Sequence, residues 1–187
     1  KVNAKLGTDY QLFNYYGAPD ADRVIVAMGS ICDVAEEVID YLTAHGEKVG
    51  LVKVRLFRPF RADKLVAAIP ETAKKIAVLD RTKEPGAQGE PLFMDVVTAF
   101  ATSGRQAKII GGRYGLSSKD TPPASVFAVY DELKKDEPKS QFTVGIVDDV
   151  THLSLTEKSR EETPNTAAEG TIECKFWGLG GDGTVGA

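Results

Sequence analysis

The sequence contains little cysteine, which limits the metal and redox chemistry that it can hold. Cys32 and Cys174 are its only cysteines among 187 residues, and they form no C-x-x-C motif. A 4Fe–4S cluster uses four thiolate ligands, and a structural zinc site uses a close set of Cys and His ligands. We therefore expect no metal ligands in this chain, and two small, buried thiols are typical of a reducing cytoplasm.

The sequence also lacks a long apolar run and an excess of positive charge. No stretch approaches the ~20 apolar residues of a membrane helix, and residues 1–5 lack the apolar core of a signal peptide. The formal net charge of −4 provides no electrostatic basis for binding nucleic acid. With 42% hydrophobic and 27% charged residues, the composition indicates a soluble, cytoplasmic, globular protein without a membrane or nucleic-acid partner.

Apolar runs alternate with amphipathic segments between residues 24 and 150. The run at 24–28 is continuously apolar, which is typical of a strand buried on both faces. Further strands are predicted at 49–56, 76–79, 108–110 and 142–147, with helices starting near residues 30, 62, 91 and 121. This alternation predicts a three-layer α/β domain in which helices cover both faces of a mostly parallel, five-stranded sheet.

The first of these helices has recognisable signals at both ends. Ser30 and Asp33 have the spacing of a capping box, in which each side chain bonds a free backbone amide. Gly46 is expected to end the helix in a left-handed conformation, and His45 lies in the last turn, where the helix dipole favours positive charge. We therefore interpret His45 as a partner of the helix end and not as a catalytic base.

Segments outside the α/β pattern flank the domain. Residues 1–23 carry Leu12, Phe13, Tyr15 and Tyr16 before a Gly/Pro turn, which predicts an extended arm packed on a surface of this chain or of a neighbour. Residues 151–170 are charged and lack an apolar stripe, so they are predicted to be a linker.

The carboxyl ends of the predicted strands gather several basic residues. In an open parallel sheet this edge is where ligands bind. A rim of cations there would bind an anion or an acidic protein surface, although loops are often polar simply because they are solvated. The residues of this predicted basic rim are Arg55, Arg58, Arg81, Lys83, Arg113 and Lys119.

Residues 1–150 contain no recognisable catalytic constellation. Cys32, in the first turn of a helix, would have either a depressed thiol pKa or the packed environment of an inert thiol. His152 lies close to Asp148 and Asp149 but has no nucleophile beside it, and Ser117 and Ser118 have no G-x-S-x-G context. We predict no catalytic residue here.

The last stretch, residues 171–187, is a candidate binding loop. A strand-like segment leads into Gly178, Gly180 and Gly183, which fit the G-x-G-x-x-G spacing of phosphate-binding loops. No helix follows, so we expect the start of a further domain; a turn between two strands is the alternative. The candidate ligand-binding residues are Gly180, Gly181, Asp182, Gly183, Thr184, Val185 and Gly186.

Six segments of the chain resemble pyruvate:ferredoxin (flavodoxin) oxidoreductase. They are 12–30 (LFNYYGAPDADRVIVAMGS), 50–60 (GLVKVRLFRPF), 77–92 (AVLDRTKEPGAQGEPL), 112–119 (GRYGLSSK), 142–155 (FTVGIVDDVTHLSL) and 174–187 (CKFWGLGGDGTVGA). The resemblance implies that residues 24–150 are the family's second domain, a non-catalytic scaffold similar to the C-terminal domain of transketolase, with one antiparallel strand. It also implies that residues 171–187 begin the third domain, which binds coenzyme A, although Gly181 stands where a serine is expected.

The parent enzyme implied by this resemblance is a homodimer that converts pyruvate to acetyl-CoA and CO2. It would use thiamine diphosphate, Mg²⁺ and 4Fe–4S clusters, and reduce ferredoxin or flavodoxin. Two other interpretations remain open. The chain would be a free-standing binding or regulatory module for a phosphorylated ligand such as coenzyme A, or a small dinucleotide-binding protein, which the lack of a helix after Gly183 disfavours.

Overall fold

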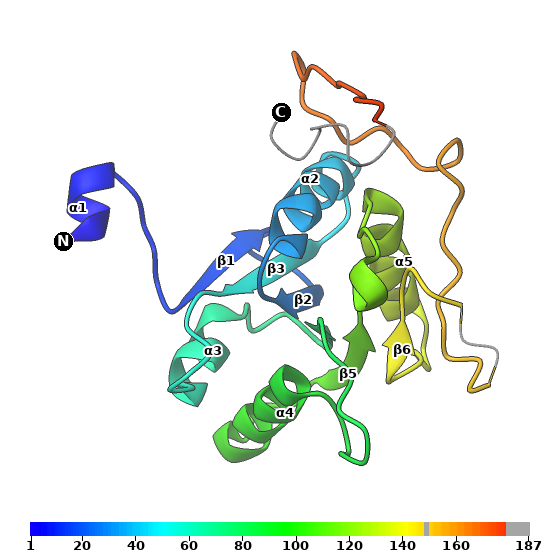
Figure 1. Cartoon of the computed structure of the whole chain (residues 1–187). Helices are drawn as coiled ribbons and strands as arrows, with labels where there is room; N and C mark the ends of the chain where they lie inside the picture. Colours follow the sequence, from blue (N-terminus) through cyan, green and yellow to red (C-terminus); the bar gives the residue numbers. More distant parts are fainter. Residues whose placement is uncertain (148–149, 179–187) are drawn as a thin grey trace.

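The computed structural model describes residues 1–147 and 150–178. The helices and strands alternate along most of this length (Figure 1). In chain order they are α1 (Val2–Leu6), β1 (Phe13–Gly17), β2 (Arg23–Ala27), α2 (Ile31–Ala44), β3 (Val49–Val54), α3 (Ala62–Ala68), β4 (Lys75–Asp80), α4 (Pro91–Ser103), β5 (Lys108–Arg113), the 3-10 turn η1 (Leu116–Ser118), α5 (Pro123–Lys134) and β6 (Phe142–Thr143).

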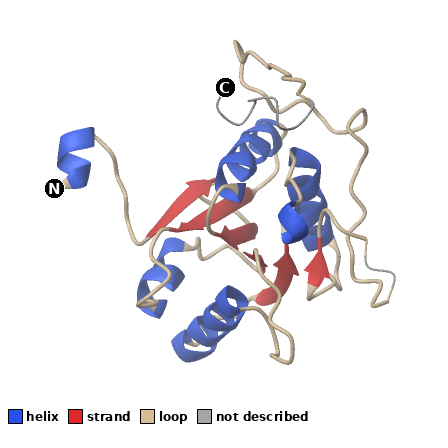
Figure 2. Ribbon diagram, in the orientation of Figure 1, coloured by secondary structure: helices blue, strands red, loops and turns tan. Residues whose placement is uncertain are grey.

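The strands form one mixed sheet in the order β1-β3-β2-β4-β5-β6. All neighbouring pairs are parallel except β1 and β3, which run antiparallel. Helices α2 and α5 cover one face and α3 and α4 cover the other, so the sheet lies between two helical layers (Figure 2). The predicted α/β fold with a mostly parallel sheet is confirmed, and the antiparallel strand implied by the family resemblance is β1.

The described sheet has six strands, and not the five that the sequence predicted. The additional strand is β1, which lies within the predicted N-terminal arm and pairs with β3 from Phe13↔Val54 to Gly17↔Gly50. Glycine at position 50 leaves room for Tyr15, because a Cβ there would lie 2.1 Å from the Tyr15 hydroxyl oxygen unless that side chain moved. The surface that the arm was expected to cover is therefore the edge of this chain's own sheet.

The central strands form the core on both faces of the sheet. Val24, Ile25, Val26 and Ala27 of β2 are fully buried, as the continuous apolar run predicted. Alternate residues contact opposite layers: Ile25 packs with α2 and α5, whereas Val24 and Val26 pack with α3 and α4. Burial of these side chains contributes much of the free energy that stabilises a parallel sheet.

Helix α2 confirms one predicted end and corrects the other. Gly46 has φ +84°, and the amides of Gly46 and Glu47 bond the carbonyls of Thr43 (3.0 Å) and Leu42 (2.9 Å), as expected of a glycine-ended helix. The predicted capping box is wrong, because the Ser30 side chain makes no cap hydrogen bond. Ser30 itself has helical backbone angles (φ −64°, ψ −23°), whereas a capping serine needs an extended backbone to reach the next amides.

The last strand is shorter than predicted, and a later segment contacts it. β6 covers two residues of the predicted 142–147, and a single parallel bridge joins Thr143 to Ser154. The Leu155 amide donates to the Thr143 carbonyl over 2.9 Å. Glu157 Oε1 accepts from the Gly145 amide (2.7 Å) and the Ser125 hydroxyl (2.8 Å). Residues 154–157, called the strap below, thus lie along β6 and the start of α5.

The two ends of the described chain make few contacts with the domain. Helix α1 contains no buried residue and stands apart from the sheet in Figure 1. The segment 171–178 is exposed throughout and has no regular secondary structure. Among the described residues, no helix has the length and apolar character needed to cross a bilayer.

Candidate functional site

The carboxyl edge of the sheet is the place where this topology would bind a ligand. From β2 the chain crosses to β3 on one side, and from β4 it crosses to β5 on the other. Such a reversal of direction opens a crevice outside the carboxyl ends of the two strands, and ligands of open α/β sheets bind there. The residues that border this crevice decide whether the domain can hold a small molecule.

Asp80, the last residue of β4, occupies the anion-binding position at the start of α4. Its two carboxylate oxygens accept hydrogen bonds from the amides of Leu92 (3.0 Å) and Phe93 (3.1 Å). The side chain is buried, and burial raises the pKa of Asp80 above its ordinary value, although the two amides act in the opposite direction. Free amides at a helix start are where phosphate groups bind in related folds. Here the protein's own carboxylate fills that position.

Tyr114 closes the crevice from the other side. It follows β5, and its side chain crosses β4 to donate a hydrogen bond of 2.8 Å from its hydroxyl to the Met28 carbonyl after β2. The ring is buried, and burial raises the pKa of Tyr114 to about 12, so the phenol remains a neutral donor at neutral pH. The gap between the ends of β2 and β4 is thus spanned by an internal side chain.

Arg113 is held in an internal ion pair and is not available to a ligand. Its Nε lies 2.6 Å from Oε1 of Glu90, which is only 1% exposed. Its two terminal nitrogens donate to the Gln141 carbonyl (3.0 Å) and side-chain oxygen (3.2 Å). The guanidinium therefore connects β5, the residue before α4 and the residue before β6.

Other members of the predicted basic rim also have partners within the chain. Arg55 lies over the ring of Tyr10 (4.9 Å to its centre), and Arg58 pairs with Asp95 at 2.6 Å. Arg81 donates from Nε to the Gly115 carbonyl at 3.4 Å, while Lys83 and Lys119 are exposed on their loops. Four of the six cations thus each interact with a different partner within the chain. This favours the interpretation that these loops are polar because they are solvated, and not because they form one anion-binding rim.

Cys32 and His45, two further candidates from the sequence, have structural and not catalytic surroundings. Cys32 is buried, and burial raises the pKa of its thiol to about 11, so it is a packed thiol and not a nucleophile. The expectation that both thiols are buried is wrong for Cys174, which is exposed. Nδ1 of His45 lies 2.7 Å from the Tyr41 carbonyl, and its ring stacks on that of Tyr41. Asp148 and Asp149, which could have acted on His152, lie outside the described residues, as do Gly180, Gly181, Asp182, Gly183, Thr184, Val185 and Gly186.

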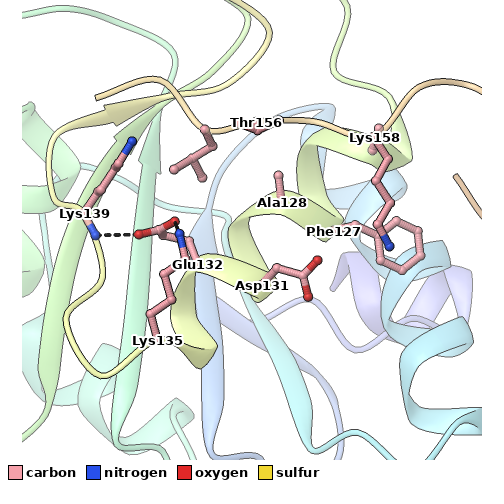
Figure 3. Close-up of a pocket in the computed structure, with 10 residues that line it drawn as sticks. Phe127, Ala128, Asp131, Glu132, Lys135, Lys139, Thr156 and Lys158 are labelled. Carbon is pink, nitrogen blue, oxygen red and sulfur yellow. Dashed lines mark hydrogen bonds and ion pairs between the residues drawn. The ribbon is translucent and has the colours of Figure 1, made fainter. Parts of the chain in front are cut away.

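A small cavity lies between α5 and the strap, away from the carboxyl edge (Figure 3). Its volume is about 170 Å³, which is below the ~300 Å³ of the smallest usual ligand sites. The most buried polar residue in its wall is Glu132, whose carboxylate accepts from the Lys139 amide (2.7 Å) and the Lys135 ammonium (2.6 Å). These bonds satisfy the carboxylate and join the end of α5 to the loop before β6, so the cavity is a packing feature.

The residues that close the carboxyl edge were not found from the sequence. Asp80 and Glu90 were visible only as members of a polar loop, and Tyr114 as part of a glycine-rich turn. Arg113 was predicted as a member of the basic rim, but its pairing with Glu90 was not. An acidic residue directly after a buried strand was a possible signal. It could not be interpreted, because the helix start that it bonds lies 12 residues later.

Sequence comparisons identify the family of this chain. Residues 21–123, more than half of the chain, match the family model described as pyruvate:ferredoxin oxidoreductase core domain II. The chain is 58% identical over its whole length to pyruvate:ferredoxin oxidoreductase of Moorella thermoacetica, and 54% identical to pyruvate-flavodoxin oxidoreductase of Klebsiella pneumoniae. It spans only 16% of the length of each of these relatives.

Among solved structures, the chain resembles 2-oxoglutarate:ferredoxin oxidoreductase from Magnetococcus marinus, solved with 2-oxoglutarate, coenzyme A and succinyl-CoA bound. The TM-score is 0.45 at 21% sequence identity, and the match covers 71% of this chain and 21% of that one. The match to the family model, together with the identity to curated relatives along all 187 residues, establishes the relationship. This chain belongs to the pyruvate:ferredoxin oxidoreductase core domain II family.

Proposed function

We propose that this chain is a non-catalytic scaffold domain of an enzyme that oxidatively decarboxylates pyruvate to acetyl-CoA and CO2 and passes the electrons to ferredoxin or flavodoxin. The observation that carries the proposal is that the chain's own side chains fill the crevice between the carboxyl ends of β2 and β4. Asp80 takes the anion position of α4, and Tyr114 spans the crevice to Met28. A domain whose crevice is filled in this way keeps the fold of a ligand-binding domain but has no space for a ligand there. Its role would then be to support neighbouring domains.

The donor groups of this chain do not fit the cofactors of such an enzyme. A 4Fe–4S cluster needs four thiolates, whereas this chain contains a buried Cys32 and an exposed Cys174. Among residues 1–147 and 150–178, no group of three or more His, Cys, Asp and Glu side chains could hold a metal ion. We infer that thiamine diphosphate, Mg²⁺ and the clusters are held by other parts of a longer, homodimeric polypeptide.

Within that polypeptide, we propose that residues 24–150, together with β1 and the strap, form the scaffold domain, which belongs to the transketolase C-terminal type. The contacts of Glu157 with Gly145 and Ser125 support the inclusion of the strap. The rest of the predicted linker would lead to a coenzyme A-binding domain that begins near Thr171. The glycine-rich stretch 180–186 would contribute backbone amides to that ligand's phosphates, since its spacing suits close approach of the chain.

An activity assay tests the scaffold proposal directly. The purified 187-residue chain is incubated with pyruvate, coenzyme A, thiamine diphosphate, Mg²⁺ and an oxidised viologen dye. No pyruvate-dependent reduction is expected, and any turnover above buffer would sink the proposal. In the full-length enzyme, Tyr114→Phe should lower thermal stability without changing kcat, because the phenol holds two strands together and touches no substrate.

Calorimetry distinguishes the scaffold from a free-standing binding module. Titration of the chain with coenzyme A at concentrations up to the millimolar range should release no binding heat. Saturable binding that is lost in an Arg81→Ala, Lys83→Ala, Lys119→Ala variant would instead favour a module that binds a phosphorylated ligand at the carboxyl edge. Inorganic phosphate serves as the second titrant, because it probes the anion site without the rest of coenzyme A.

A further inference from the structure

The outer side of helix α4 is exposed and uncharged. Met94 and Val97 are 40% and 37% exposed, and Ala101 continues their row one turn later. Residues three or four positions apart share one side of a helix. In Figure 1 the helix lies at the outside of its layer, on the opposite side of the molecule from residues 158–178. The exposed set, called the α4 face below, is Met94, Val97, Thr98, Ala101 and Thr102.

The polar groups on and beside the α4 face already have partners. Thr98 Oγ1 donates to the Met94 carbonyl (2.8 Å), and Thr102 Oγ1 donates to the Thr98 carbonyl (2.9 Å). Asp95 is the only charged residue of the helix, and its carboxylate pairs with Arg58 at 2.6 Å. Two threonine methyl groups and three apolar side chains therefore form a strip that contains no charge.

The other two long helices have charged outer sides. α2 exposes Asp33, Glu37 and Asp40, and α5 exposes Asp131 and Lys134. Charged residues make up 27% of the chain, so an exposed helix of 13 residues with one paired charge differs from the rest of the surface. Depletion of charge, together with an exposed methionine, is typical of the centre of an interface.

The shape of the α4 face suits another helix. Val97, Ala101 and the two threonines have short side chains, so a second helix could approach closely and pack into the grooves between them. Met94 is flexible enough to fill the space that remains. An apolar helix is therefore the partner that fits this strip.

The area of the α4 face favours a partner on the same polypeptide. A helix of 13 residues is about 20 Å long, so a strip about 10 Å wide covers only about 200 Å². Stable complexes between separate molecules bury about 800 Å² on each partner. A smaller contact is sufficient when both parts belong to one chain, because the connection keeps their local concentration high.

We propose that the α4 face packs against an apolar helix in the part of the longer polypeptide that lies outside these 187 residues. The inference rests on the proposed function, in which this chain is one domain of such a polypeptide. The chain spans 16% of the length of two curated relatives, so most of the polypeptide remains to supply the helix.

Cysteine labelling tests whether the α4 face is covered. Ala101→Cys introduces a small thiol at an exposed position of the face. In the full-length polypeptide this thiol should react with iodoacetamide at least about tenfold more slowly than in the 187-residue chain, because reaction then requires local opening of the contact. Mass spectrometry of the labelled peptide measures both rates. The buried Cys32 should stay unlabelled in both forms, which shows that the domain is folded.

A second substitution tests whether the contact is apolar. Val97→Glu, added to Ala101→Cys in the full-length polypeptide, should restore fast labelling while Cys32 stays protected. Val97→Thr is the matched control, because it keeps the size of the side chain without adding charge, and labelling should stay slow. Slow labelling in the Val97→Glu variant would overturn the proposal.

Equal labelling of the introduced thiol in the full-length polypeptide and the 187-residue chain would also overturn the proposal. Slow labelling in the 187-residue chain would do the same, and sedimentation would then show whether a second copy covers the α4 face. The viologen assay of the 187-residue chain is independent of these rates, so the proposed function and the docking of the helix can fail separately.

Discussion

The hydroxyl of Tyr114 and the carbonyl of Met28 are joined by a 2.8 Å hydrogen bond, although the two residues lie 86 positions apart in the sequence. The bond connects the ends of β5 and β2 across the intervening strand β4. It lies at the reversal point of the sheet, where an open α/β fold would otherwise receive a ligand. The stability of the sheet and the closure of its binding edge therefore depend on the same side chain.

Removal of the Tyr114 hydroxyl should destabilise the domain measurably. Tyr114→Phe leaves the Met28 carbonyl without this partner in a partly buried position, so the free energy of unfolding should fall by about 0.5–1.5 kcal/mol. Urea denaturation followed by circular dichroism measures the change. The exposed Tyr10 offers the matched control, and Tyr10→Phe should alter stability by no more than about 0.5 kcal/mol. Similar effects of both substitutions would contradict the assigned role of Tyr114.

Removal of one partner of the ion pair between Glu90 and Arg113 should strongly destabilise the fold. Glu90→Ala leaves the mostly buried guanidinium of Arg113 without its carboxylate, and a loss of about 3–5 kcal/mol is expected. The exposed pair of Arg61 and Asp63 is the control, and Asp63→Ala should cost less than about 1 kcal/mol. Denaturant titrations of both variants measure the two losses of unfolding free energy. Equal losses would contradict the prediction that the buried pair matters more than the exposed pair.

Three tyrosines should make the protein lose stability at alkaline pH. Burial raises the pKa of Tyr15 and Tyr114 to about 12, and a hydrogen bond to Asp40 is the main reason that the pKa of Tyr16 is also raised to about 12. Their ordinary pKa is 10.0, so the unfolded chain releases these protons first. The stability that these protonated phenols contribute is fully present below pH 10 and is lost as the pH rises towards about 12.

Ultraviolet absorbance of tyrosinate, recorded alongside circular dichroism, should therefore show delayed ionisation of these phenols until the fold is lost. Tyr114→Phe should flatten the pH dependence of the unfolding free energy in this range. If the pH dependence of the unfolding free energy were unchanged in that variant, the pKa of Tyr114 would not be raised in the folded protein.

Glu157 should control whether the strap stays on the domain. Glu157→Ala removes the acceptor shared by the Gly145 amide and the Ser125 hydroxyl. The free energy of local opening should fall by about 1–2 kcal/mol, so that the Leu155 amide exchanges its hydrogen more quickly. Hydrogen–deuterium exchange with peptide resolution measures this, and Glu169→Ala, in an exposed part of the predicted linker, is the control. Unchanged exchange at Leu155 would contradict the role given to Glu157.

Local sequence patterns determined the parts of the fold that depend on neighbouring residues. The apolar run of β2 predicted a strand buried on both faces, and Gly46 predicted the end of α2, because each signal acts within a few residues. The aromatic density before Gly17 indicated a packed arm. It did not reveal strand β1, since the identity of its partner depends on a segment some forty residues later.

Only the tertiary structure decided what the carboxyl edge can do. Asp80 meets a helix start 12 residues later, Glu90 meets an arginine 23 residues later, and Tyr114 reaches a carbonyl 86 residues earlier. A sequence shows which residues carry charge or a hydroxyl group, but the partner of each group is chosen by the packing of distant elements. The chain by itself therefore determined an α/β domain related to a known enzyme, whereas the closure of its ligand edge became visible only when the strands were placed side by side.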